Sequence, residues 1–386
     1  MSAERRLRGF TAPGEAETRD RARAVSAAAF AARAPRRRAS RLRFVPVAAA
    51  LALVVVLAAT APGDAVADWF RDLVRAERPT PGRAPALTAL PAPGRVLVTG
   101  PGGAWVVQRD GSSRRLGGYE DAAWSPRGLF VAVTRGRSLS AVEPGGAVRW
   151  TLARAEPVSQ PVWAPSGFRI AYRAGSSLRV VAGDGSGDRL LTRRAAAVAS
   201  AWKPNTRRHR LAFAGQRGAI ELRDTDTGRR LWRSARGVVP TDLEWVAGGR
   251  SLAVLRGDRL ELLDGKGRVR RSVRLPGRAL SGSARPGRTD FAVSVAGRDG
   301  VGRVMLLRVR GTPPAPRTLF AAPGAIGEVA FSPDGSTVLA SRSGVGEWLT
   351  LPVERGHARA IGGIARHFDP RHERPRGMPT VSGWTR

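Results

Sequence analysis

The residues best suited to chemistry gather near the C-terminal end of the chain. Two imidazoles and two carboxylates lie close together there: His367, Asp369, His372 and Glu373. Such groups can bind zinc or another divalent ion. Three arginines, Arg366, Arg371 and Arg374, surround them and would repel a cation or neutralise the acids. The pattern therefore favours a polar surface loop with internal ion pairs over a metal site.

Two other stretches have the composition of ligand-binding loops. Residues 183–187 are rich in glycine like a phosphate loop, but no helix follows whose N-terminus could hold a phosphate. Asp224, Asp226 and Gly228 resemble part of a calcium loop, but the distal glutamate of such loops is missing. Both stretches fall where a strand pair needs a tight turn, so we predict hairpin turns.

Covalent catalysis has no sequence support either. The chain contains no cysteine, which excludes disulfides and thiolate metal sites. It also lacks the Gly-x-Ser-x-Gly motif that exposes a nucleophilic serine in many hydrolases. We therefore expect a protein that is not an enzyme and that holds no cofactor.

The elements that would position any functional residue come from a short repeated motif. The motif is clearest at residues 124–128, Trp-Ser-Pro-Arg-Gly, and degenerate copies follow roughly every 40–50 residues. A large side chain ends one strand, proline presets the first turn position, and glycine supplies the positive φ of the return. The repeat positions are Trp124, Pro126 and Gly128; Trp163, Pro165 and Gly167; Trp202 and Pro204; Trp245 and Gly249; Pro286 and Gly287; and Phe331, Pro333 and Gly335.

This repeat length is typical of one four-stranded blade, so we predict an all-β fold, a β-propeller over residues 86–386 with a C-terminal tail. Several strands after the turns are apolar on both faces, as expected of sheets stacked face to face. Counting from Ala86 gives seven blades. Six blades are the alternative, if the first unit is partial and is closed by residues 378–384.

The repeats resemble a known family. Residues 331–339, Phe-Ser-Pro-Asp-Gly-Ser-Thr-Val-Leu, are similar to the repeat of TolB-like propellers, and Trp124 and Trp163 stand where that family has its aromatic residue. The whole chain resembles the WD-type bacterial propellers that a single span anchors in the membrane of high-GC bacteria. The resemblance implies a place in the cell envelope and leaves the ligand open.

A second resemblance is local. Residues 222–232 are similar to the tryptophan-docking motif of pyrroloquinoline-quinone propellers, and residues 146–150 are a fainter copy. Quinone-dependent dehydrogenases repeat this motif in blade after blade, whereas here one clear copy exists. A dehydrogenase is therefore the weakest of the functional alternatives.

The N-terminal part of the chain predicts a membrane anchor. Residues 44–63 are uncharged and would span about 30 Å as a helix, which matches the hydrocarbon core of a bilayer. Residues 1–43 are basic and include a predicted helix over 15–33, so the positive-inside rule places the N-terminus in the cytoplasm and the propeller outside. Residues 64–85 predict a juxtamembrane helix and a proline-rich linker. A cleaved signal peptide is the alternative, because Ala65-Val66-Ala67 fits a cleavage site.

The charge of the chain is strongly positive, with a formal net charge of +34. Nearly all the basic residues are arginine, which together with heavy Ala, Gly and Pro use indicates codon bias. We therefore expect the arginines to be spread over blade edges and loops, and we expect no nucleic-acid partner. The leading hypothesis is a non-enzymatic scaffold or sensor that binds a protein or an envelope polymer. The alternative is an anti-sigma type regulator whose residues 15–33 bind a cytoplasmic protein.

Overall fold

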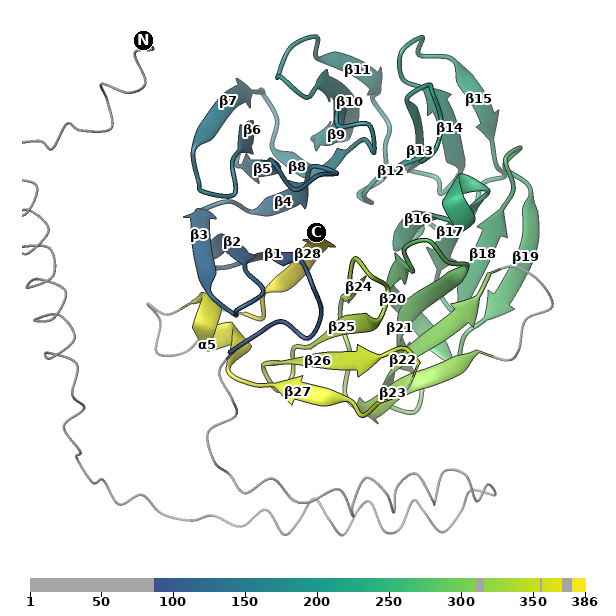
Figure 1. Cartoon of the computed structure of the whole chain (residues 1–386). Helices are drawn as coiled ribbons and strands as arrows, with labels where there is room; N and C mark the ends of the chain where they lie inside the picture. The colour runs from purple at the N-terminus through teal and green to yellow at the C-terminus, as the bar shows by residue number, and fades with distance from the viewer. Residues whose placement is uncertain (1–86, 310–315, 355, 370–376) are drawn as a thin grey trace, which may run out of the picture. The chain divides into compact units, whose positions relative to one another are not determined.

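The structure is a computed structural model that describes residues 87–309, 316–354, 356–369 and 377–386. These residues form a ring of seven four-stranded sheets (Figure 1). The prediction of an all-β propeller with seven blades is confirmed, and the six-bladed alternative is wrong. The predicted tail 1–43, the membrane helix 44–63 and the linker 64–85 lie outside the described residues. Among the described helices, none has the length and apolar character needed to cross a membrane.

Each blade is an antiparallel sheet whose strands run in order from the centre of the ring to its rim. Blade 1 contains β28 (Thr380–Thr385), β1 (Arg95–Gly100), β2 (Gly103–Val107) and β3 (Ser113–Gly117). Blade 2 contains β4 (Asp121–Trp124), β5 (Val131–Arg135), β6 (Ser138–Val142) and β7 (Val148–Ala153). Blade 3 contains β8 (Val158–Trp163), β9 (Arg169–Ala174), β10 (Ser177–Ala182) and β11 (Arg189–Thr192).

The other four blades follow the same order. Blade 4 contains β12 (Ala201–Trp202), β13 (Arg210–Ala214), β14 (Ile220–Asp224) and β15 (Arg230–Arg233). Blade 5 contains β16 (Asp242–Val246), β17 (Ser251–Arg256), β18 (Arg259–Leu263) and β19 (Val269–Arg274). Blade 6 contains β20 (Gly277–Ala284), β21 (Asp290–Gly297), β22 (Val301–Arg308) and β23 (Arg317–Pro323). Blade 7 contains β24 (Val329–Phe331), β25 (Thr337–Arg342), β26 (Glu347–Pro352) and β27 (Arg359–Ile361).

The ring is closed by strands from the two ends of the described chain. β28 pairs with β1 in antiparallel register, for example Val98 with Val381, and so supplies the innermost strand of blade 1. The short helix α5 (Ile364–Phe368) packs beside this closure, with Phe368 between the rings of Trp105 and Trp348. The C-terminal segment predicted to close the ring therefore does so. It supplies the fourth strand of blade 1, which makes blade 1 a complete blade and gives seven blades in all.

The hydrophobic core lies between blades. One cluster joins Ala132 and Leu139 of blade 2 to Ile170 and Tyr172 of blade 3, all of them buried. The apolar runs predicted after each turn supply these residues, because both faces of a blade contact a neighbour. Burial of both faces thus explains why the strands do not alternate between apolar and polar residues.

The innermost strands form a ring of edge strands, whose backbone groups have no strand partner on the central side. Side chains of one blade accept hydrogen bonds from the backbone of the next. The Asp121 carboxylate accepts from Gln160 N at 2.9 Å, Asp242 accepts from Gly282 N at 2.9 Å, and Glu244 accepts from Ala284 N at 2.7 Å. In the later blades, Ser283 Oγ accepts from Phe331 N at 3.1 Å. These contacts pair backbone donors that burial would otherwise leave unsatisfied.

Two of the repeated tryptophans contact the preceding blade, in the opposite direction along the ring. Trp202 Nε1 donates to Val162 O at 2.9 Å, and Trp245 Nε1 donates to Ala201 O at 3.0 Å. Each of these two indoles therefore reaches back to the innermost strand of the preceding blade, to the residue just before the tryptophan of that blade. Trp124 and Trp163 occupy the same repeat position, but their Nε1 atoms have no hydrogen-bond partner among the described residues.

The outermost strands carry the arginines. Every one of the seven has at least one: Arg114 and Arg115 in β3, Arg149 in β7, Arg189 in β11, Arg230 and Arg233 in β15, Arg270, Arg271 and Arg274 in β19, Arg317 in β23, and Arg359 in β27. Charged side chains on an exposed edge oppose pairing with another chain. Part of the positive charge thus lies on the outer edges of all seven blades.

Removal of one indole donor tests the backward contact. Trp245 and Trp163 are equally buried, at 7% exposure each, but Trp163 Nε1 has no hydrogen-bond partner among the described residues. Because Trp245→Phe removes a hydrogen bond to Ala201 O and Trp163→Phe removes none, we expect it to lower the free energy of unfolding by about 0.5 to 1.5 kcal/mol more than Trp163→Phe does. Urea denaturation of both variants measures this difference. Equal losses would show that the indoles act through packing alone.

Candidate functional site

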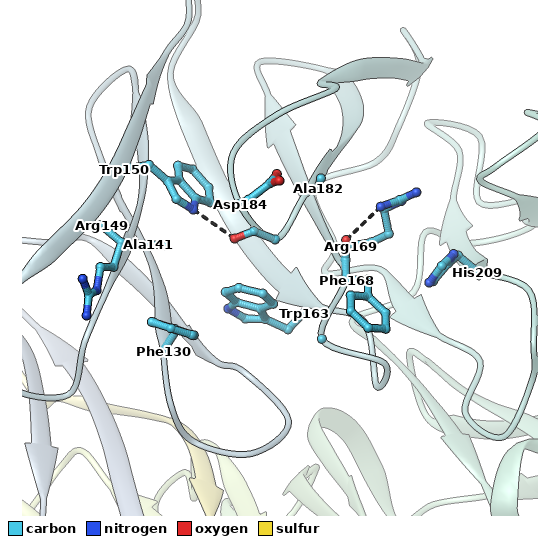
Figure 2. A pocket seen from close by; sticks show the side chains of 12 residues that line it. Phe130, Ala141, Arg149, Trp150, Trp163, Phe168, Arg169, Ala182, Asp184 and His209 are labelled. Atoms are coloured by element: carbon cyan, nitrogen blue, oxygen red, sulfur yellow. Dashed lines mark hydrogen bonds between the residues drawn. The ribbon is translucent and has the colours of Figure 1, made fainter.

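The strongest candidate for a binding site is a groove between blades 2 and 3, with a volume of about 660 Å³ (Figure 2). It opens on the face of the ring that carries the turns between first and second strands and between third and fourth strands. Its lining comes from both blades and from one turn of blade 4. The lining residues are Phe130, Ala141, Arg149, Trp150, Trp163, Gly167, Phe168, Arg169, Ala182, Gly183, Asp184 and His209.

Trp150 of β7 forms one wall of the groove. Its Nε1 donates to Gly183 O at 2.9 Å, and its ring lies against Gly185, where an added Cβ would come within 2.8 Å (Figure 2). Trp232 of β15 packs in the same way on Gly267, with an added Cβ at 2.4 Å. Both tryptophans of the predicted docking motif therefore join one blade to the next, and a glycine must receive each ring.

Apolar residues are exposed on the turns around this groove. Leu129 follows the turn glycine of blade 2 and is 59% exposed, and Phe168 follows the turn glycine of blade 3 and is 68% exposed. In blades 5 and 7 the same repeat position holds Arg250 and Ser336. Val148, at the start of β7, is exposed as well. Of these three residues only Phe168 lines the groove. Exposed apolar residues that gather on one face are typical of a contact surface for another molecule.

Basic groups lie at the edge of the groove. Arg149 forms an ion pair with Glu143, so the carboxylate partly offsets the positive charge of Arg149. Arg169 donates to Phe168 O at 3.0 Å and lies 3.5 Å from the carboxylate of Asp226. The groove thus combines aromatic walls with cations that are partly neutralised. This arrangement suits a ligand that has an apolar group surrounded by acidic groups.

Three side chains near the groove have the spacing of a serine-histidine-aspartate triad. His209 Nδ1 lies 2.8 Å from Asp226 Oδ2, and His209 Nε2 lies 3.1 Å from Ser166 Oγ. This order of contacts is the one that activates a serine nucleophile in hydrolases. No sequence motif indicates this arrangement, because the three residues come from two turns of blades 3 and 4 and from the predicted hairpin at 224–228.

Two observations argue that these three residues are structural. Hydrolysis requires free donors for the oxyanion, but the nearest backbone N–H groups are used: Gly167 N donates to Ala164 O at 2.8 Å, and Phe168 N donates to Ser166 Oγ at 3.3 Å. Asp226 is also shared with the guanidinium groups of Arg169 and Arg189, each at 3.5 Å. The arrangement holds the turns of blades 3 and 4 together.

The predicted metal candidates are only partly described. The prediction of a loop at His367 is wrong, because His367 lies in the short helix α5. The next residue, Phe368, packs against Trp105 and Trp348 and holds this helix in place. Burial lowers the pKa of His367, and its Nε2 lies 3.0 Å from Ser113 Oγ. Asp369 is buried at the end of α5, whereas His372 and Glu373 lie outside the described residues. No three potential metal ligands come together in the described part of the chain.

The two loop-like motifs are turns, as predicted. Asp184 Oδ1 accepts from Ser186 N at 2.9 Å, and residues 183–187 connect β10 to β11. Asp224 Oδ1 accepts from the backbone N–H of Asp226 and of Thr227, both at 3.0 Å, between β14 and β15. In both turns the aspartate binds its own backbone, which is the usual role of this residue there.

The repeat residues lie where the motif predicts. Trp124, Trp163, Trp202 and Phe331 each end an innermost strand, and Trp245 is the penultimate residue of β16. The turn glycines Gly128, Gly167, Gly249, Gly287 and Gly335 all have positive φ. The prolines Pro126, Pro165, Pro204, Pro286 and Pro333 precede or enter these turns. All of these residues build the blades, and of them Trp163 and Gly167 also line the groove.

Two acids in β16 have unusual titration. Burial raises the pKa of Asp242, and burial together with the nearby Asp242 charge raises the pKa of Glu244 to about 8. Perturbed acids often mark active sites. Here, however, both carboxylates are occupied by backbone donors of blade 6. Their role is therefore to join blades 5 and 6.

Comparison with known proteins supports the fold alone. No family model matches the chain, and no curated protein matches it. Many solved structures match, among them a chain of hydrazine synthase from Kuenenia stuttgartiensis, with 15% identity and a TM-score of 0.50. That match covers 61% of this chain and 77% of the other. At this identity the likeness concerns the propeller architecture.

The Glu244 carboxyl makes stability depend on pH. Its folded pKa of about 8 exceeds the ordinary value of 4.5, so between these values the folded state keeps a proton that the unfolded state loses. Stability should therefore fall as pH rises from about 4.5 to 8. Glu244→Gln keeps an oxygen acceptor for Ala284 N and removes this titration. We expect the melting temperature of the variant, relative to that of the wild type, to rise steadily as the pH increases across that range. A constant difference between the two proteins at pH 5, 6.5 and 8 would contradict the assignment.

Proposed function

We propose that this protein is a non-enzymatic binding module of the cell envelope. In this proposal residues 44–63 form a single membrane span, residues 1–43 lie in the cytoplasm and the propeller lies outside. Support comes from the uncharged 20-residue stretch, from the arginines just before it and from the resemblance to membrane-anchored bacterial propellers.

The groove between blades 2 and 3 is the proposed contact site, and the observation that carries it is the exposure of Leu129 and Phe168. Two adjacent blades place apolar residues at a repeat position that is polar in blades 5 and 7. An apolar residue of a partner would enter the groove against the aromatic walls, and Leu129 and Phe168 would exclude water around it. The positive charge of the chain favours an acidic surface around that residue. The partner is thus a protein with an apolar anchor in acidic surroundings.

Binding without catalysis is supported by the chemistry of the described residues. Beside the contacts of Ser166, His209 and Asp226, the backbone N–H groups of Gly167 and Phe168 already donate within the turn and are not free to bind an oxyanion. Both loop-like motifs are closed turns. A fluorophosphonate probe, which labels activated serines, should therefore leave the protein unmodified. Labelling that disappears in Ser166→Ala would contradict the proposal and would identify a hydrolase.

The contact site can be tested by removing its apolar rim. The double variant Leu129→Ser/Phe168→Ser should lose the proteins that co-purify with the full-length chain from its native membrane, because both side chains are exposed and their loss leaves the fold intact. Val345→Ser is the matched control, since Val345 is 56% exposed on blade 7. Quantitative mass spectrometry compares the three preparations. Retention of every partner by the double variant would remove this face from the proposal.

The membrane topology has its own test. A reporter that is active only outside the cytoplasm, fused after Arg386, should be active in intact cells. One that works only in the cytoplasm should be inactive at the same position. Reversed activities would place the propeller in the cytoplasm and overturn the envelope part of the proposal.

A further inference from the structure

A second groove lies between blades 4 and 5, with a volume of about 650 Å³. It is lined by the end of β15 and the following loop, by the turn between β17 and β18, by β18, and by the turn before β19. The first groove has aromatic walls, whereas this one has no aromatic residue in its lining. Its charged residues are Arg233, Arg236, Arg256, Arg259, Lys266, Arg268, Asp258 and Glu261.

The two acids of this groove already have partners. Glu261 Oε2 lies 3.1 Å from Arg256 Nε, and Arg256 also donates to Gly218 O at 2.8 Å, so this pair is part of the wall. Asp258 is paired from outside the groove by Arg274 at 3.4 Å and Arg298 at 3.2 Å. The acids therefore do little to neutralise the other cations of the groove.

Three exposed cations remain without an acidic partner. In the described ranges, no ion pair joins a carboxylate to Arg236, Arg259 or Lys266. The nearby Arg268 and Arg274 do form such pairs, with Asp264 and Asp258. Lys266 is one of only two lysines in a chain whose basic residues are otherwise arginine. Cations that converge on a concavity focus the electrostatic potential there.

The positions of these cations indicate a ligand longer than a single anion. Arg259 begins β18, and Arg236 belongs to the loop beside the same turn, whereas Lys266 follows the other end of the strand. The five residues of β18 span about 16 Å at roughly 3.3 Å per residue. Charge thus lies at both ends of the groove, at a separation that one phosphate or carboxylate group cannot bridge.

We propose that the groove between blades 4 and 5 binds a linear polyanion that carries no bases, with repeated phosphate or carboxylate groups contacting Arg236, Arg259 and Lys266. The exposed side chains of Val238, at 69%, and Val269, at 51%, would contact the polymer between its anionic groups. A bilayer surface is too flat to enter a groove. Sites for single-stranded nucleic acid combine a basic groove with aromatic rings on which the bases stack, and this lining has no aromatic ring.

The test uses the full-length chain in detergent with three probes of matched charge: polyphosphate, polyglutamate and a single-stranded oligonucleotide. Binding is measured by fluorescence anisotropy at about 0.05 and 0.15 M salt, where the Debye length at the higher value is roughly 8 Å. We expect polyphosphate or polyglutamate to bind more tightly than the oligonucleotide at both concentrations. Preference for one of the first two identifies the anionic group. Tighter binding of the oligonucleotide would overturn the proposal.

The matched variants are Arg236→Gln/Lys266→Gln in the groove and Arg193→Gln/Arg194→Gln in the exposed loop after β11, which remove the same charge. Loss of two anion contacts should weaken binding of the preferred polymer about tenfold at 0.15 M salt and reduce the salt dependence accordingly. The control should change affinity less than twofold. Equal weakening by both variants would show that charge is read over the whole surface and that the groove is not a site. Melting temperatures confirm that both variants fold.

Discussion

The structure depends on how the innermost strands satisfy their backbone groups. A strand at the centre of a propeller is an edge strand on its inner side, so the backbone groups that face the centre need partners outside the ladder. Asp121, Asp242 and Glu244 accept from the backbone of the following blade, while Trp202 and Trp245 donate to the blade behind. The blades are thus joined by side chains in both directions, and these contacts pair polar groups that lie beside the apolar clusters.

The sequence predicted this architecture because the constraint repeats. Most turns need a residue with positive φ, most innermost strands end near a large side chain, and these features recur along the chain with gradual degeneration. The repeat and the turn signals therefore predicted the seven blades and the turns at 183–187 and 224–228. Helix α5 was missed because Phe368 packs against Trp105 and Trp348, one of which is distant in sequence.

The candidate site was harder to predict, since it consists of departures from the repeat. Leu129 and Phe168 could have been noticed by comparing the residue after each turn glycine, but their exposure and their proximity to one groove require the structure. The alignment of Ser166, His209 and Asp226 had no local signal at all, because three separate turns supply the residues. The predicted membrane span and the helix at 15–33 belong to residues that the structure does not describe.

The pairing of β28 with β1 has a consequence for how the ring is assembled. Thr99 and Ser382, whose hydroxyl groups lie 2.7 Å apart across this closure, are separated by 283 positions in the chain. To bring such distant segments together directly from a flexible chain would cost about 5 kcal/mol of entropy. If blades 2 to 7 stack one on another first, the two ends are delivered to each other as the last step. Until that moment the inner edge of β1, with Val96 and Val98, stays open, so incomplete chains carry the surface on which a second chain could pair.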